Sequence, residues 1–410
     1  MDLKTQLYKR LDRYARVDTQ SDDKSATFPS TAKQLTLSRM LAAELKAIGA
    51  RRVRLDKHGY VTAEIPATVK GKKPVIGLLA HVDTAPDAPG KGVKPQVHRN
   101  WKGGDIVINR KLGIVLNTRN CPVLAKCKGD DIVTASGDTL LGADDKAGLA
   151  IIMTAAEHLL KRPEIPHGTL KIGFTPDEEV GQGVKYFDVK GFGADYAYTF
   201  DGDIAGSIEE ETFNADSVEI RITGKSVHPG SAKNAMANAA RIAADIVSSW
   251  PESLLPETTE GHQGFIMFTD IVGETEKASV SGIAREHDLK KLKAMEKRLE
   301  AIVAAKRRKY PLAKIELTFK ESYRNMKQVI RKHPRVMEAL KAAVRAAGLE
   351  PRIKPVRGGT DGARLSFMGL PTPNVFTGGY NYHGRYEWVS LDGMNKSAQV
   401  LINLARNWAQ

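Results

Sequence analysis

The stretch Pro74-Val75-Ile76-Gly77-Leu78-Leu79-Ala80 is followed at once by His81-Val82-Asp83-Thr84. A nearly unbroken apolar run is typical of a strand that is buried on both faces of a sheet, as in α/β proteins. A polar cluster directly after such a strand stands where open α/β sheets bind their ligands. The stretch therefore predicts an α/β domain with a candidate site at the end of this strand.

Three more predicted strands end in the same kind of polar cluster. They are residues 170–175 followed by Glu178 and Glu179, residues 196–200 followed by Asp201, and residues 373–377 followed by His383. Ligands of open α/β sheets lie at the carboxyl ends of the strands, so we expect these side chains to gather at one edge.

A second informative stretch is Gly142-Ala143-Asp144-Asp145-Lys146-Ala147-Gly148, in which two adjacent carboxylates precede a segment with helical periodicity. Asp is a common residue at a helix amino terminus, where its side chain accepts hydrogen bonds from free backbone N–H groups. Taken alone, the stretch favours helix capping. The histidines and carboxylates expected at the strand ends make Asp144 a candidate metal ligand as well.

The pattern changes between residues 212 and 324, where the predicted elements run β-α-β-β-α-β. This order is that of the ferredoxin-like split βαβ unit, which is compact enough to fold as an insert. We therefore expect a mixed-sheet α/β catalytic domain flanked by helices and formed by residues 1–211 and 325–410. Residues 212–324 would form an inserted α+β domain that serves as a dimerisation domain or lid.

Composition narrows the class of protein. The chain has 410 residues, of which 41% are hydrophobic and 27% charged, as in globular proteins. The formal net charge of +14 raises the question of a nucleic-acid partner. The basic clusters are short, scattered and free of interleaved aromatic residues, so we expect no nucleic-acid partner. Solvated surface faces are the favoured explanation of the charge, and a preference for anionic small substrates is a further option.

The location is predicted from what the sequence does not contain. The first residues lack the apolar core of a secretion signal, and no apolar run is long enough to span a bilayer. The only cysteines, Cys121 and Cys127, are too few for a disulfide framework and fit a reducing compartment. We expect a cytoplasmic protein without a membrane partner.

The candidate ligands point to metal chemistry when they are taken together. His81 and Asp83 lie two positions apart, so in an extended segment they point to the same side. The Asp83 carboxylate could then accept the second ring N–H of a metal-bound His81. Two imidazoles with several carboxylates suit zinc, with cobalt or manganese as alternatives. One carboxylate between two ions is the arrangement of paired-metal hydrolases.

Five motifs resemble those of the two-zinc exopeptidase family that includes peptidase T, glutamate carboxypeptidase and diaminopimelate desuccinylase. They are residues 81–87 (HVDTAPD), 138–148 (DTLLGADDKAG), 174–181 (FTPDEEVG), 227–230 (VHPG) and 357–362 (RGGTDG). The resemblance covers essentially the whole chain. Residues 378–384 (GGYNYHG) are more similar to the tripeptide aminopeptidases of the family than to its other members.

The resemblance implies release of the amino-terminal residue from a tripeptide, by water activated at two zinc ions per subunit. The implied ligands are His81 and Asp201 for one ion, Glu179 and His383 for the other, and Asp144 between them. Glu178 would be the general base, and Asp83 the partner of His81. A cis peptide bond between Asp144 and Asp145 is also implied.

The resemblance further implies how the substrate is held. Arg285, and with it Arg357, would bind the carboxylate of a short peptide. In a homodimer, His228 would reach the partner's active site and donate a hydrogen bond to the developing oxyanion.

Two alternatives stay open at this point. The enzyme alternative is a dipeptidase or an amidohydrolase that acts on an N-acyl amino acid, within the same family. The other is a basic protein that binds nucleic acid and carries a degenerate metal site, which the complete set of ligands disfavours.

Overall fold

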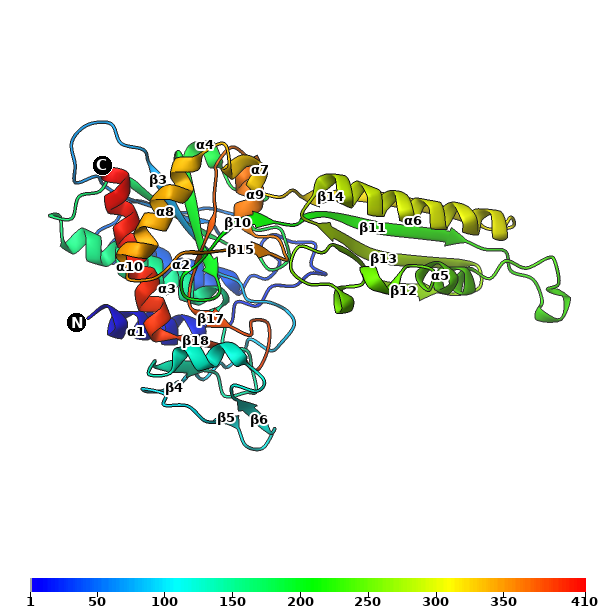
Figure 1. The fold of residues 1–410 in the computed structure, drawn as a ribbon, viewed down its shortest axis with the longest axis horizontal. Coiled ribbons are helices and arrows are strands. Elements are labelled where there is room, and N and C mark those ends of the chain that lie inside the picture. Colours follow the sequence, from blue (N-terminus) through cyan, green and yellow to red (C-terminus); the bar gives the residue numbers. More distant parts are fainter. Residues whose placement is uncertain (1) are drawn as a thin grey trace. The chain divides into compact units, whose positions relative to one another are not determined.

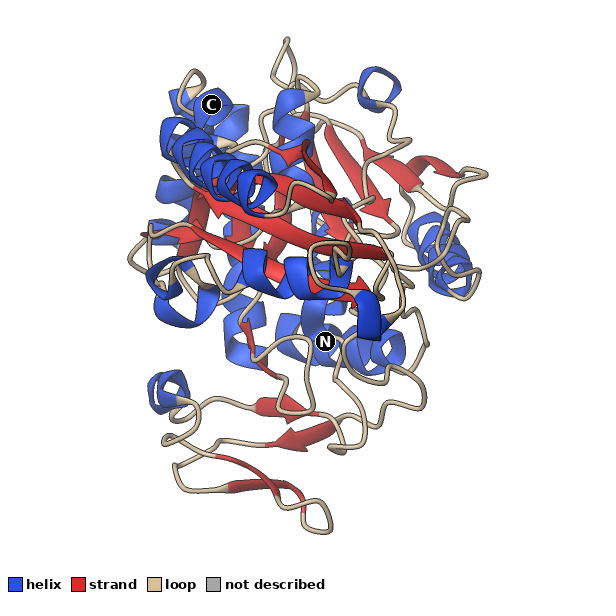
Figure 2. Cartoon of the chain, turned by 90° about the vertical axis from the view of Figure 1, so that its right-hand side faces the viewer, coloured by secondary structure: helices blue, strands red, loops and turns tan. Residues whose placement is uncertain are grey.

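The computed structural model describes residues 2–410, and the chain forms two compact units (Figure 1). Unit 1 comprises the chain up to Glu210 together with Met326–Lys354 and Thr360–Gln410. Unit 2 comprises Glu211–Asn325 and Pro355–Gly359. Both units contain helices and strands. Figure 2 shows the two kinds of element throughout the chain, and the predicted fold class is confirmed.

Unit 1 is built on an eight-stranded sheet in the order β1-β2-β8-β3-β9-β16-β10-β15. The strands are β1 (Arg51–Leu55), β2 (Val61–Ile65), β3 (Ile76–His81), β8 (Leu170–Thr175), β9 (Tyr196–Gly202), β10 (Ser207–Thr212), β15 (Arg352–Val356) and β16 (Asn374–Phe376). The neighbours β8, β3, β9 and β16 are parallel, whereas β1 and β2 form the predicted antiparallel hairpin. The four strands that carry the candidate ligands therefore end at the same edge of a mixed sheet.

Both faces of the central strand β3 are covered, and every residue of β3 is buried. On one face α3 (Ala143–Lys161) lies against β3 and β9, and it packs with α1 (Leu3–Ala15) and α10 (Leu391–Ala409). On the other face Leu79 packs with Phe192 of α4 (Val189–Phe192) and Leu365 of α9 (Asp361–Phe367). The remaining helices of unit 1 are α2 (Gln34–Ala47), α7 (Lys327–Ile330) and α8 (Pro334–Ala346).

The beginning of α3 departs from a regular helix. Asp144 (φ −84°, ψ 105°) and Asp145 (φ −118°, ψ 37°) are not helical, and the peptide bond between them is cis, as the resemblance implies. Asp145 provides the predicted capping, because its Oδ1 accepts the N–H of Gly148 at 3.0 Å. Gly148 also allows the helix to approach β9, since a Cβ there would lie 2.0 Å from the carbonyl oxygen of Phe200.

Residues 86–136 form a surface excursion that joins the carboxyl-terminal part of the chain. A four-stranded sheet in the order β17-β18-β7-β4 connects them. Its strands are β4 (Gln96–His98), β7 (Ile132–Thr134), β17 (Gly379–Tyr380) and β18 (Trp388–Ser390); β5 (Ile106–Asn109), β6 (Ile114–Leu116) and the 3₁₀ helix η1 (Pro122–Cys127) complete the excursion. The loop that bears His383 therefore lies between two strands of this sheet.

Unit 2 is an antiparallel sheet in the order β12-β13-β11-β14. Its elements along the chain are β11 (Asn214–Thr223), η2 (Pro229–Ser231), α5 (Ala239–Val247), η3 (Glu252–Leu254), η4 (Pro256–Thr258), β12 (Phe265–Gly273), β13 (Lys277–Glu286), α6 (Leu289–Lys309) and β14 (Lys314–Tyr323). Side chains of α5 and α6, such as Ile242 and Leu299, share one apolar core with Ile220 of the sheet. The order β-α-β-β-α-β is the predicted one.

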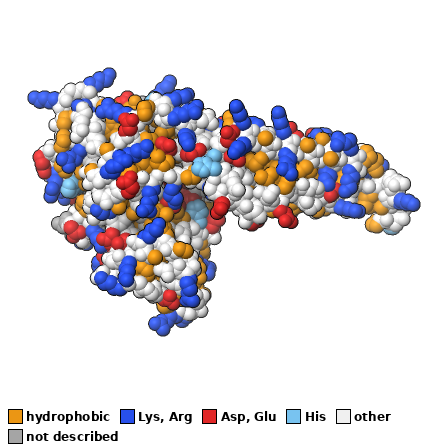
Figure 3. Space-filling model, viewed as in Figure 1, with side chains coloured by type: hydrophobic (Ala, Val, Ile, Leu, Met, Phe, Trp, Pro, Cys, Tyr) orange, Lys and Arg blue, Asp and Glu red, His pale blue; other side chains and the backbone are white. Residues whose placement is uncertain are grey.

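Lys and Arg side chains are scattered among Asp and Glu over the face shown in Figure 3. No helix within residues 2–410 combines the length and the apolar character that crossing a membrane requires.

Candidate metal centre

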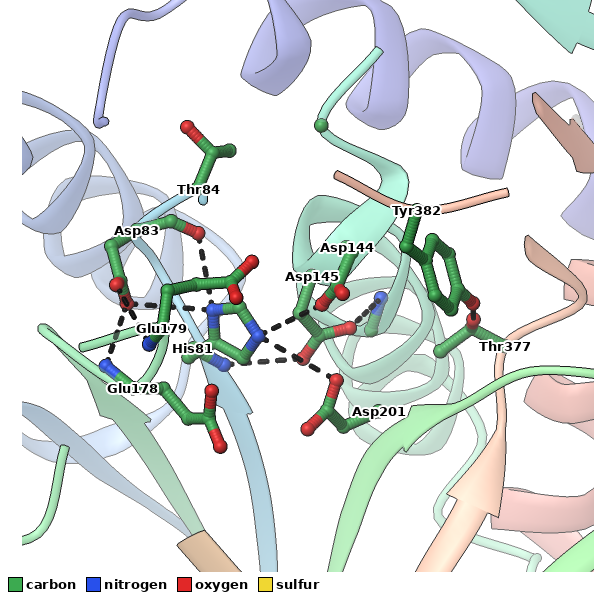
Figure 4. Close-up of polar contacts among 12 residues, drawn as sticks. His81, Asp83, Thr84, Asp144, Asp145, Glu178, Glu179, Asp201, Thr377 and Tyr382 are labelled. Atoms are coloured by element: carbon green, nitrogen blue, oxygen red, sulfur yellow. Dashed lines mark hydrogen bonds and ion pairs between the residues drawn. The ribbon is translucent and has the colours of Figure 1, made fainter. Parts of the chain in front are cut away.

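His81 lies at the middle of a polar cluster at the end of β3, and only 2% of its side chain is exposed (Figure 4). Its Nε2 is 3.0 Å from Oδ1 of Asp144 and 3.5 Å from Oδ1 of Asp201. Asp83 lies on the opposite side of the ring, where Nδ1 is 3.1 Å from its backbone oxygen and 3.4 Å from its Oδ1. A proton on Nδ1 would therefore leave Nε2 free to bind an ion.

The Asp83 carboxylate contacts more than His81. Its Oδ1 accepts the N–H of Glu178 at 3.0 Å, and its Oδ2 accepts the N–H of Glu179 at 3.1 Å. We expected a hydrogen bond from His81 to this carboxylate, but the shorter contact is to the backbone oxygen of Asp83. The reason is that β3 and β8 are neighbours, so the backbone that follows β8 competes for the carboxylate.

Asp144 lies between the two histidines. Its Oδ1 faces Nε2 of His81 at 3.0 Å, and its Oδ2 faces Nε2 of His383 at 3.4 Å. The same nitrogen of His383 is 3.0 Å from Oε2 of Glu179. The two oxygens of one carboxylate thus face two different imidazoles.

Two groups of side chains could each hold a metal ion, because the potential ligand atoms within each group all lie within 4.8 Å of one another. One group is His81, Asp144 and Glu179, and the other is His81, Asp145 and Asp201. Asp145, which the sequence analysis treated only as a neighbour of Asp144, already accepts the backbone N–H of His81 at 3.1 Å and that of Gly148. Asp145 therefore holds the backbone in place, and Asp201 is the carboxylate available to a ligand.

The crowding of buried acids shifts their pKa values. Burial, together with the charge of Asp144, raises the pKa of Glu179 to about 8 and that of Asp201 to about 6. Burial and the charge of Asp201 also raise the pKa of Glu178 well above its usual range. Hydrogen bonds to Asp144 and Glu179 raise the pKa of His383 to about 11. The cluster thus holds more carboxyl groups than its two imidazoles can neutralise, so some of these acids are ionised only with difficulty.

The residues of the cluster fit a divalent metal ion. Imidazole nitrogens and carboxylate oxygens are the donors that zinc, cobalt and manganese accept. Oε1 of Glu179 is buried and has no hydrogen-bond partner among residues 2–410, which is costly for a carboxylate oxygen unless a cation binds it. The excess of buried carboxylates would be compensated in the same way.

Two residues that the sequence analysis did not select contact this cluster. The Glu387 carboxylate is buried and accepts the backbone N–H groups of Leu141, Gly142 and Asp144. The Tyr382 hydroxyl donates to the carbonyl oxygen of Gly202, next to Asp201. An available signal for Glu387 was that it is an acid directly before the apolar residues of a short buried strand, β18.

Arg285, Arg357 and His228 belong to unit 2. Nη1 of Arg285 donates to the hydroxyl of Tyr323 at 2.9 Å, while its Nε is buried and has no partner in the described part of the chain. The guanidinium of Arg357 donates to the carbonyl oxygens of Thr259, Gly261 and Gln263.

His228 is exposed and precedes η2. Its Nδ1 accepts the N–H of Gly230 at 3.1 Å. In the neutral imidazole the proton is then on Nε2, which makes Nε2 a hydrogen-bond donor.

The sequence profile of the family described as Peptidase family M20/M25/M40 matches residues 140–407. Peptidase T of Caldanaerobacter subterraneus subsp. tengcongensis is 47% identical over 400 residues, which cover 98% of each chain.

Two solved structures share the fold. They are aminopeptidase PepT of Bacillus cereus, with a TM-score of 0.76, 23% identity and 99% of each chain covered, and a tripeptidase of Staphylococcus aureus, with a TM-score of 0.79, 21% identity and 99% and 98% covered. The sequence and the fold agree, and the chain belongs to peptidase family M20/M25/M40.

Proposed function

We propose that the protein is a metal-dependent aminopeptidase that releases the amino-terminal residue from tripeptides. Family membership supports a peptidase, and the relative at 47% identity is a peptidase T. Proteins of the same fold include an aminopeptidase and a tripeptidase. The observation that carries the proposal is the position of Asp144, whose two oxygens each face one imidazole.

We assign two zinc ions to the cluster, with cobalt or manganese as alternatives. The proposed ligands are His81 and Asp201 for one ion, His383 and Glu179 for the other, and Asp144 for both. When bound, such ions polarise a carbonyl group and lower the pKa of the attacking water.

Glu178 is the proposed general base. Within residues 2–410 its carboxylate has no hydrogen bond or ion pair with another side chain or backbone group, while its backbone is fixed by Asp83. Its raised pKa suits a group that takes a proton from water and then gives it to the leaving amine. Asp83 would orient His81 and Glu178 together.

Arg285 and Arg357 are the proposed binding residues for the substrate carboxylate. Arg285 suits this role because its Nε lacks a partner within the described residues 2–410 and its Nη1 is already oriented by Tyr323. Both Nη atoms of Arg357 donate to backbone oxygens, and Nη2 also donates to Oγ1 of Thr259, so bidentate binding of a carboxylate requires the guanidinium to exchange at least one of these bonds.

We further propose a cytoplasmic homodimer in which His228 acts in the partner's active site. The strand β12 is an edge of its sheet and exposes Ile271 and Val272, and edge strands with apolar residues favour pairing. The Nε2 donor of His228 is suited to stabilise an oxyanion. Mixed dimers of Glu178→Gln and His228→Ala subunits should regain activity; inactive mixed dimers would exclude the role in trans.

A substrate panel on metal-depleted protein reloaded with zinc tests the function. We expect hydrolysis of the first bond of a tripeptide, and rates lower by about 100-fold or more for the N-acetylated tripeptide, because a site that binds a charged amine rejects its acylated form. A dipeptide or an N-acyl amino acid cleaved faster than the tripeptide would contradict the proposal and favour a dipeptidase or an amidohydrolase.

A further inference from the structure

The Glu387 side chain hydrogen-bonds the segment that carries His383 to the turn of residues 141–144, at the start of α3. Its side chain is 1% exposed and lies just before β18. Its Oε2 accepts the N–H groups of Leu141 and Gly142, both at 2.7 Å, and its Oε1 accepts the N–H of Asp144 at 3.1 Å. One carboxylate therefore binds three backbone donors within four consecutive residues.

The turn needs such a partner because the helix does not supply one. N–H groups at a helix amino terminus have no partner within the helix. The N-cap residue, Gly142, has a left-handed backbone (φ 73°) and no side chain that could cap. Asp144 is not helical, and its own carboxylate faces the histidines. Asp145 caps the N–H of Gly148, which lies further along α3, and the Glu387 carboxylate binds the three earlier N–H groups with bonds that its charge strengthens.

The position of this turn decides where the Asp144 carboxylate lies. Its oxygens face His81 at 3.0 Å and His383 at 3.4 Å, so a small shift of the backbone would move the carboxylate away from one imidazole or both. His383 lies four residues before Glu387 on the same segment. That segment thus carries the His383 imidazole, and through Glu387 it also holds the Asp144 carboxylate between His81 and His383.

We propose that Glu387 is a positioning residue for the metal centre: it holds the turn of residues 141–144 so that Asp144 can bind two metal ions at once. The proposal rests on the metal-dependent function proposed above. It extends that function to a residue that would contact neither ion nor substrate.

Ion binding by metal-depleted protein tests the proposal without measuring catalysis. Glu387→Gln has the same shape but places an NH₂ group against N–H donors. We expect its dissociation constants for Zn²⁺, measured by calorimetry with a competing chelator, to rise by about 10- to 100-fold, as for other groups that orient ligands. Wild-type affinity in Glu387→Gln would overturn the proposal.

Asp131→Asn is the matched control. Asp131 is also buried, and its Oδ1 accepts the N–H of Asn100 at 2.8 Å, but it contacts none of the proposed ligands. We expect it to lower the melting temperature without changing the zinc affinity. Equal losses of affinity in both variants would show a general structural effect and overturn the positioning role.

Hydrogen exchange on the wild-type protein provides a measurement that needs no variant. The N–H groups of Leu141, Gly142 and Asp144 should exchange slowly in the metal-free protein, because the Glu387 carboxylate already holds them. Fast exchange there would overturn the proposal even if Glu387→Gln failed to fold. A wild-type protein that binds no divalent ion would instead refute the proposed function.

Discussion

The two imidazoles of the candidate metal centre are held in opposite ways. His81 ends a buried strand, is 2% exposed and has Asp83, which is fully buried, behind its Nδ1. His383 lies in a loop with a left-handed backbone (φ 62°) and is 45% exposed. The acid nearest its Nδ1 is Asp87, 3.6 Å away and 62% exposed.

This difference divides the site into a fixed half around His81 and an adjustable half around His383. Ligands that are locked by packing and hydrogen bonds bind an ion without further loss of conformational freedom. We infer that the ion beside His81 binds more tightly than the ion beside His383.

The largest effect is expected from His81→Ala. The variant should lose the tightly bound ion and with it nearly all activity. His383→Ala should lose only the weaker ion and should keep one zinc per subunit after dialysis. Metal analysis of the dialysed proteins measures both outcomes, and loss of the tighter ion in His383→Ala instead would reverse the comparison.

Added imidazole distinguishes the two variants further. A free imidazole can enter the exposed position of His383, so His383→Ala should regain part of its activity. The site of His81 is enclosed, and His81→Ala should not respond. Equal rescue of both would mean that exposure does not distinguish the two halves.

Glu178→Gln should lower kcat by about 10²- to 10⁴-fold, which is the usual contribution of a general base. Both ions should remain, because Glu178 is not a proposed ligand and its N–H to Asp83 is unchanged. Steady-state kinetics and metal analysis on the same sample check this. A sample that retains one ion would place Glu178 among the ligands.

Asp83 and Asp87, which lie near Nδ1 of His81 and Nδ1 of His383, offer a matched comparison with a smaller expected effect. Asp83→Asn should weaken the tighter site by about 10- to 100-fold, as is usual for groups that orient ligands. Asp87→Asn should change the weaker site by less than about threefold, because exposed ion pairs contribute little. Zinc titration of both variants measures the ratio, and similar losses would contradict the distinction.

The part of this site that the sequence predicted follows from local patterns. His81 and Asp201 stand where apolar strands end, and the order of the sheet brings those ends together. Asp144 stands where a helix begins. Such positions depend on residues nearby in the chain, so periodicity and polarity suffice to find them.

The position of Glu387 before a short apolar strand is a local signal, but its hydrogen-bond partners could not be found in this way. Its partners Leu141 and Asp144 are 246 and 243 positions away, and nothing in the local pattern specifies that distance. The hydrogen bonds of Asp145 to the backbone of His81 and Gly148 are a related case, because they depend on the irregular backbone at the start of α3. The hydrogen bonds of the Asp83 carboxylate to the backbone of Glu178 and Glu179 likewise depend on the pairing of β3 with β8.

The central claim is that Asp144 joins two metal ions. Anomalous diffraction from crystals loaded with zinc tests it most directly. The account predicts two peaks about 3.5–4 Å apart, each about 2.0–2.2 Å from a different oxygen of Asp144. The peak near His81 should have the higher occupancy at limiting zinc. A single peak, or two peaks with Asp144 bound to only one of them, would contradict the account.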